Sequence, residues 1–127
     1  TVIVLSNVYN STTTTVGSDV AAMYFGISTA APTLSLEPLP ERQLSGTSGS
    51  FRFGADFYNP NAEVMVDIRD GHAYLVWNGG PFESALVATG PDRFVDRMFW
   101  SDVEFIRDDD GTVVELLFDQ FSGQRVD

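Results

Sequence analysis

Most of the chain alternates apolar and polar residues in short runs, a pattern typical of half-buried β-strands. Apolar side chains recur at every second position in residues 50–53, 64–69 and 72–77, so each stretch presents one apolar face. The turn sequence Asp70-Gly71 separates the last two stretches, and Asp108–Gly111 separates a further pair of apolar runs. Because glycine adopts positive φ in such turns without steric cost, both sites predict β-hairpins.

Further turn sequences divide residues 44–127 into seven or eight short strands. They fall at residues 59–61, 78–81 and 90–92. So many strands joined by tight turns predict a small antiparallel barrel or sandwich. Thirteen of the 16 aromatic residues lie beyond residue 43 and supply large side chains for its core. The side chains expected in the interior are those of Phe51, Phe53, Phe99, Val103, Phe105, Leu116 and Phe118.

The N-terminal third of the chain has a different pattern. Residues 2–9 begin with four consecutive apolar side chains, which indicates a strand buried on both faces. Apolar residues then recur at helical spacing over 16–27 and predict a helix of about three turns. Three prolines favour an extended linker over residues 28–43, which divides the N-terminal part, 1–27, from the β domain. The candidate N-caps of the helix are Thr14, Thr15 and Ser18.

Charge and composition exclude several classes of function. The net charge of −11 should repel nucleic acid and anionic membrane surfaces, so neither is expected as a partner. All seven basic residues are arginines, which excludes a lysine base or amine nucleophile in this chain. The absence of cysteine excludes disulfides and thiolate catalysis and leaves the redox compartment open. No cofactor is expected.

The order of segments along the chain resembles a known arrangement. An apolar strand "TVIVLSNVY", the helix "VGSDVAAMYFGI" and a Pro-rich linker precede a compact β domain. This order resembles the end of the β-lactamase-like serine hydrolases, the superfamily of penicillin-binding proteins and class C β-lactamases, followed by their lipocalin-like C-terminal domain. The segments that carry the likeness to that domain are "SGSFRFG" at 48–54, "VDIRDGHAYLVW" at 66–77, "GPDRFVDR" at 90–97 and "VEFIRDDDGTVVEL" at 103–116.

The resemblance implies a division of roles between the two parts of the chain. Residues 1–27 would be the last strand and helix of a hydrolase domain, and 44–127 a lipocalin-like barrel. The Ser-x-x-Lys element of the family cannot exist in a chain without lysine, so no catalytic residue is expected. The implied function is a non-catalytic accessory or regulatory domain. It would pack on the catalytic domain of the parent chain, or form a homo-oligomer when isolated. Since the family occurs in several compartments, no localisation follows.

Three polar groups could be read as catalytic or metal sites. The carboxylates of Asp108–Asp110 could form a calcium loop, although their spacing better fits a solvated hairpin tip. Asp102 and Glu104 alternate on one strand, which is typical of a wet face and also of a carboxylate pair. His72 is the single histidine and excludes a multi-histidine metal site. A hydrolase built on Asp102, Glu104 and His72 stays open as the weakest of three hypotheses.

Four aromatic residues are candidates for ligand or partner binding: Trp77, Trp100, Tyr74 and Phe94. Core filling is favoured for Trp77 by its place in an alternating strand. Trp100 is expected on the same face as Asp102 and Glu104, where it could dock another domain. The alternative function is a small hydrophobic-ligand binder of lipocalin type, with the ligand inside the barrel. The number of large side chains argues for a filled interior.

Overall fold

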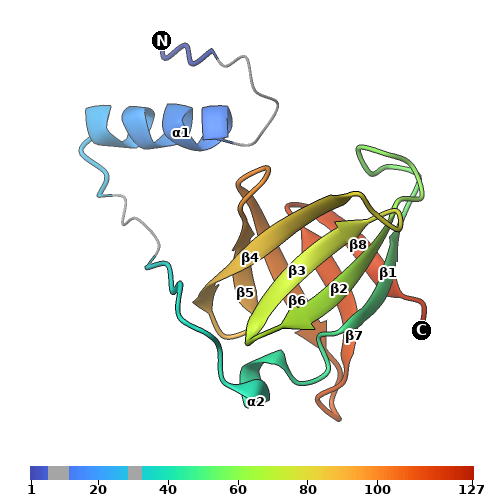
Figure 1. Ribbon diagram of the computed structural model, residues 1–127. Helices are drawn as coiled ribbons and strands as arrows, with labels where there is room; N and C mark the ends of the chain where they lie inside the picture. The colour runs from blue at the N-terminus through green and yellow to red at the C-terminus, as the bar shows by residue number, and fades with distance from the viewer. Residues whose placement is uncertain (6–11, 29–32) are drawn as a thin grey trace.

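The computed structural model describes residues 1–5, 12–28 and 33–127. Each barrel strand pairs antiparallel with the next along the chain, and the first pairs with the last, so that the sheet closes (Figure 1). Closure confirms the prediction of a mainly β fold with a small antiparallel barrel of lipocalin-like architecture. The elements are α1 Thr12–Tyr24, α2 Glu41–Leu44, β1 Gly49–Phe53, β2 Glu63–Arg69, β3 His72–Trp77, β4 Phe82–Gly90, β5 Arg93–Asp96, β6 Ser101–Arg107, β7 Val113–Phe118 and β8 Phe121–Arg125.

The alternation of each strand places its apolar residues inside the barrel. In β3, for example, Ala73, Leu75 and Trp77 are buried while the residues between them are half-buried. Six of the seven side chains expected in the interior are buried there. Phe99 is partly buried instead, because it lies in the turn between β5 and β6 and packs on the core from the rim.

Both predicted hairpins are present. Asp70 and Gly71 have φ of 50° and 77° between β2 and β3, which is the backbone of a two-residue turn with both φ positive. Gly71 is also required sterically, since a Cβ there would lie 2.8 Å from Cβ of Pro38. Gly111, with φ of 82°, closes the second hairpin between β6 and β7.

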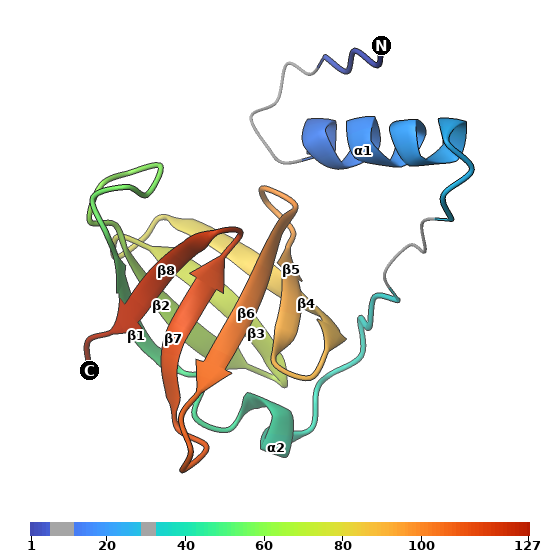
Figure 2. The same cartoon turned by 180° about the vertical axis from the view of Figure 1, so that it is seen from behind.

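The N-terminal part differs from expectation in two respects. Residues 1–5 have no regular secondary structure, and 6–9, the rest of the predicted strand, lie outside the described residues. Helix α1 is confirmed, and both views show it standing apart from the barrel (Figures 1 and 2). It begins at Thr12, so Thr14, Thr15 and Ser18 lie within the helix, and their assignment as N-caps was wrong.

The second half of the predicted linker is attached to the barrel. Ser35 forms a β-bridge with Ala88, and the backbone N–H of Leu39 donates to the carbonyl of Gly71 at 2.8 Å. The expectation of an extended connection up to residue 43 was wrong at its end, where α2 forms directly after Pro40. Leu44 of α2 is buried, so this short helix covers one end of the barrel core.

Candidate functional site

The barrel has two ends of different chemistry. We call the end covered by α2, with the turns β2–β3, β4–β5 and β6–β7, the helix end. The opposite end, formed by residues 54–62, 78–81, 97–100 and 119–120, is called the aromatic end. Charged side chains connect the segments of the helix end by hydrogen bonds, whereas aromatic side chains fill the aromatic end.

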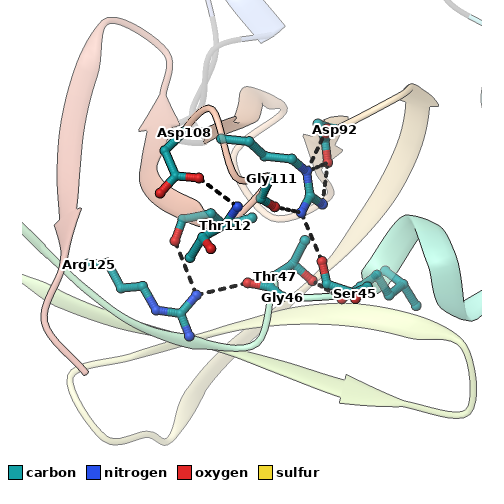
Figure 3. Close-up of polar contacts among 11 residues, drawn as sticks. Ser45, Gly46, Thr47, Asp92, Asp108, Gly111, Thr112 and Arg125 are labelled. Carbon is teal, nitrogen blue, oxygen red and sulfur yellow. Dashed lines mark hydrogen bonds and ion pairs between the residues drawn. The ribbon is translucent and has the colours of Figure 1, made fainter.

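Arg107 organises the polar contacts of the helix end (Figure 3). Its Nε and Nη2 donate to the carboxylate of Asp92 at 2.8 to 3.1 Å. Its Nη1 donates to the carbonyls of Ser45 and Gly111 at 3.0 and 2.9 Å. The hydrogen bond to Asp92 raises the pKa of Arg107, which therefore remains charged. Arg107 thus joins three segments, namely the β4–β5 turn, the β6–β7 hairpin and the chain after α2.

Arg125 is bound in the same manner. Its Nη1 donates to the carbonyl of Gly46 at 2.8 Å (Figure 3). Its Nη2 donates to the carbonyl of Ser48, also at 2.8 Å. Nη1 also lies 3.3 Å from the carbonyl of Val113, and Nε donates to Asp127 at 3.0 Å. Both guanidinium groups thus satisfy backbone carbonyls at a chain crossing, which is a structural role.

The remaining polar features of the helix end are a hairpin tip and a small cleft. Asp108 accepts hydrogen bonds from the backbone N–H of Asp110 and Thr112 at 3.0 and 2.8 Å, which fits the hairpin-tip interpretation. The part of the chain that the structure describes holds no group of three or more metal-ligating side chains. A cleft of about 270 Å³ lies beside α2 and is lined partly by Asp92 and Arg107. These two side chains form an ion pair with one another.

The aromatic end is built around Phe57. This side chain comes from the β1–β2 loop and is buried against the rings of Phe53 and Trp77, whose own centroids lie 5.9 Å apart. The ring centroids lie 4.1 and 5.7 Å away, at interplanar angles of 17° and 11°. Phe118 and Phe121 meet the Phe57 ring edge-on at 6.0 and 5.3 Å. Sequence analysis missed Phe57, although a phenylalanine inside the polar loop "GADFYNPN" was a signal for it.

A buried carboxyl group lies inside the wall of the barrel. Asp96 on β5 is fully buried, and Ser84 and Ser101 on the neighbouring strands are buried as well. Ser84 Oγ donates to Asp96, as do the backbone N–H groups of Met98 and Phe99 at 3.3 and 2.9 Å. Burial raises the pKa of Asp96. The sequence indicates this position, because Asp96 follows Phe94 by two residues on one strand. Two such side chains point to the same face, which here is the inner face of the barrel.

The four aromatic residues predicted as a site do not come together. Trp77 and Phe94 are core residues, and the ring of Phe94 meets that of Phe105 at 5.5 Å. Tyr74 is on the outer wall, where the guanidinium of Arg69 lies 3.9 Å from its ring centroid. Trp100 is exposed, as expected. It lies in the β5–β6 turn with φ of 58°, however, and not on the face of β6 that was expected.

The three residues of the hydrolase hypothesis are also separated. His72 is on β3, whereas Asp102 and Glu104 are on β6, and these two strands are not neighbours in the barrel. The buried positions of both strands alternate with these residues, so all three are on the outer wall. This arrangement cannot bring them to one substrate.

Neither a protein-family model nor a curated protein matches this sequence. The kinship with β-lactamase-like hydrolases therefore rests on the sequence segments alone and stays a prediction. Among the described helices, none has the length and apolar character needed to cross a membrane.

Proposed function

We propose that this chain is a non-catalytic accessory domain of a β-lactamase-like serine hydrolase, which docks on the catalytic domain through its N-terminal part. The observation that carries the proposal is a concentration of exposed apolar side chains before residue 28. We call these side chains the N-terminal apolar surface: Ile3, Leu5, Met23, Tyr24, Phe25 and Ile27. Each is at least 60% exposed, whereas large apolar residues of the barrel are mostly buried.

Helix α1 also needs a partner for its own stability. It has 13 residues, near the lower limit at which an isolated helix is stable in water, and it contains Gly17 and four threonines. Residues 1–5 lie against it, since a Cβ on Gly17 would be 3.6 Å from Cγ2 of Val4. This contact leaves the larger apolar side chains uncovered. Packing against another surface would supply the missing stabilisation.

The distribution of charge favours docking through this part and not through the barrel. Residues 1–40 contain two charged side chains, Asp19 and Glu37, so 16 of the 18 carboxylates and all seven arginines lie beyond them. The later part therefore has a net charge of −9 (seven arginines less 16 carboxylates), and two barrels repel each other. The N-terminal apolar surface carries no such penalty. In the isolated chain the same surface leads to self-association.

Sedimentation velocity of the isolated chain tests the docking surface. The wild-type chain is expected to associate as its concentration rises. The double variant Met23→Glu/Phe25→Glu should stay monomeric. The matched control is Met65→Glu/Phe82→Glu, which changes the same residue types at exposed positions of the barrel and should associate like wild type. A strictly monomeric wild type, or equal loss of association in both variants, contradicts the proposal.

The assignment to a hydrolase has a separate test. The genomic reading frame upstream of Thr1 should encode a domain with Ser-x-x-Lys, and in that full-length protein Met23 and Phe25 should be protected from solvent. A continuous upstream frame without Ser-x-x-Lys would remove the hydrolase from the proposal. The docking surface would still be tested by sedimentation.

A further inference from the structure

The turn between β5 and β6, residues 97–100, is held by one residue. The carboxylate of Asp96 accepts hydrogen bonds from the backbone N–H groups of Met98 at 3.3 Å and Phe99 at 2.9 Å. The backbone carbonyl of Asp96 accepts the N–H of Trp100 at 2.9 Å. Three of the four residues of the turn are therefore bonded to Asp96, which is itself fully buried.

The closed turn is strained and covers part of the core. Trp100 has φ of 58°, in the left-handed region that a bulky residue rarely adopts. Its side chain is exposed, so packing compensates little for this strain. Phe99 packs on the core, and its ring centroid lies 6.5 Å from that of Phe118. Opening of the turn would release the strain at Trp100 and expose the core at the aromatic end.

No positive charge balances Asp96 in this position. Its neighbours on β4 and β6 are the uncharged, buried Ser84 and Ser101. Among the described residues no arginine forms an ion pair with Asp96, and the side chain of Arg97 beside it is exposed. Asp119 of the β7–β8 turn adds a like charge. Since an ionised carboxylate in a protein interior needs a counter-charge or water, ionised Asp96 depends on water.

Water can reach Asp96 by displacement of the turn. Strand β5 is paired with β4 on one side and with β6 on the other, so movement of the strand itself would break the closed barrel. The turn lies at the rim, where the backbone N–H of Arg97 donates to the carbonyl of Ala85 at 3.0 Å and Phe99 packs on the core. Opening of the turn is therefore the smallest movement that hydrates the carboxylate.

We propose that the β5–β6 turn is a pH-dependent gate at the aromatic end, which protonated Asp96 holds closed and which ionisation of Asp96 favours opening. Protonated Asp96 keeps an oxygen that accepts from the turn and gains an O–H for Ser84. Burial raises the pKa of Asp96 in the closed form above the ordinary value of 3.8, which the hydrated carboxyl of the open form regains. Between these pKa values, each pH unit favours the open form by up to about tenfold. The gate is independent of docking through α1.

Hydrogen exchange of the full chain, followed by NMR from about pH 4 to 8, tests the gate. Each amide is described by its protection factor, the exchange rate in an unstructured chain divided by the measured rate at the same pH. The protection factors of Met98, Phe99 and Trp100 should fall by up to about tenfold per pH unit and level off above the folded pKa of Asp96. At every pH they should lie at least about tenfold below those of β2 and β3, because the turn opens without the barrel.

The β6–β7 hairpin is the matched control within the same chain. The exposed carboxylate of Asp108 also accepts two backbone N–H groups, those of Asp110 and Thr112, but its ionisation needs no opening. Protection of these two amides should not fall as pH rises. Asp96→Asn keeps an acceptor for the turn and cannot ionise, so protection of its turn should not depend on pH.

Three results would overturn the gate. The first is protection of the wild-type turn that does not fall with pH. The second is equal protection of the turn and of β2 and β3, since the turn would then open only when the whole barrel unfolds. The third is a folded Asp96→Asn variant whose turn loses protection with pH as the wild type does. If Asp96→Asn does not fold, the first two measurements on the wild-type chain decide.

Discussion

The buried carboxyl of Asp96 makes the stability of the barrel depend on pH in a direction opposite to that of most carboxylates. Burial raises its pKa above the ordinary value of 3.8. The ordinary value applies to the unfolded chain and the raised value to the folded chain. At a pH between the two, Asp96 is ionised in the unfolded chain but keeps its proton in the folded chain. The folded state then binds more protons, so the free energy of unfolding falls as pH rises through this interval. Above the folded pKa the contribution is constant.

Two substitutions separate the charge of Asp96 from its hydrogen bonds. Asp96→Asn keeps an acceptor for the N–H groups of Met98 and Phe99, and its amide can donate to Ser84. Asp96→Ala leaves these donors unpaired, at about 1 to 3 kcal/mol for each well-formed bond. Because the bond to Met98 is long, we expect Asp96→Ala to lose about 2 to 5 kcal/mol. Asp96→Asn should stay within about 1 kcal/mol of wild type at pH 4.

Urea unfolding from pH 4 to 8 measures these differences. Relative to wild type, Asp96→Asn should gain stability as pH rises from about 4, and the gain should level off above the folded pKa of Asp96. Asp102→Asn removes the same charge from an exposed position on β6 and controls for the general repulsion in this acidic chain. The stability gained by Asp96→Asn should depend on pH more strongly than the stability gained by Asp102→Asn. If it does not, the conclusion that the pKa of Asp96 is raised by burial is refuted.

Three further substitutions, with Arg93→Ala as a control, test the packing of the barrel by chemical denaturation. Arg107→Ala should lower the free energy of unfolding by about 2 to 4 kcal/mol, since it leaves a carboxylate and two carbonyls without their donor. Arg93→Ala should lower it by under about 1 kcal/mol, because the ion pair of Arg93 is exposed. Gly123→Ala should cost about 1 to 3 kcal/mol, because its Cβ would lie 3.1 Å from the ring of Phe53. Gly71→Ala should be worse tolerated, since its φ of 77° is strained for alanine and its Cβ would overlap the proline packed on the turn.

The outcomes that would contradict these expectations are specific. Equal losses for Arg107→Ala and Arg93→Ala would mean that the contacts of Arg107 at the chain crossing add no stability. A stabilised Gly123→Ala would show that the ring of Phe53 has room to move. A Gly71→Ala variant as stable as wild type would mean that the close approach of Pro38 to the β2–β3 turn does not require glycine at position 71.

Much of the barrel was predictable because period-two alternation and turn chemistry are local signals. The pattern of Ala73, Leu75 and Trp77 predicts both a strand and its buried face, and Asp70-Gly71 predicts how that strand is reached. Closure was not predictable in this way. Alternation says which face is buried but not which strands meet, so a barrel and a sandwich stayed open until β1 and β8 were seen to pair.

The candidate site was predicted poorly because its chemistry depends on loops and ends. Phe57 is in a polar loop, where no period indicates the direction of its side chain. Trp100 was assigned to β6 by extending the alternation backwards, but the chain turns at that residue with positive φ. The contact of Arg107 with Ser45 and that of Arg125 with Gly46 join residues more than 60 positions apart in the chain, which no local pattern records.

Closure through β1 and β8 also constrains how the protein is made. Every other strand pair joins neighbours in the chain and can form as they leave the ribosome, but β1 must wait for β8. At about 5 to 20 residues per second, the interval between Gly49 and Arg125 corresponds to about 4 to 15 s of translation. During that time one edge of the nascent sheet is open to addition of a foreign strand. Arg52 lies on that edge strand, and its charge discourages such pairing until the barrel closes.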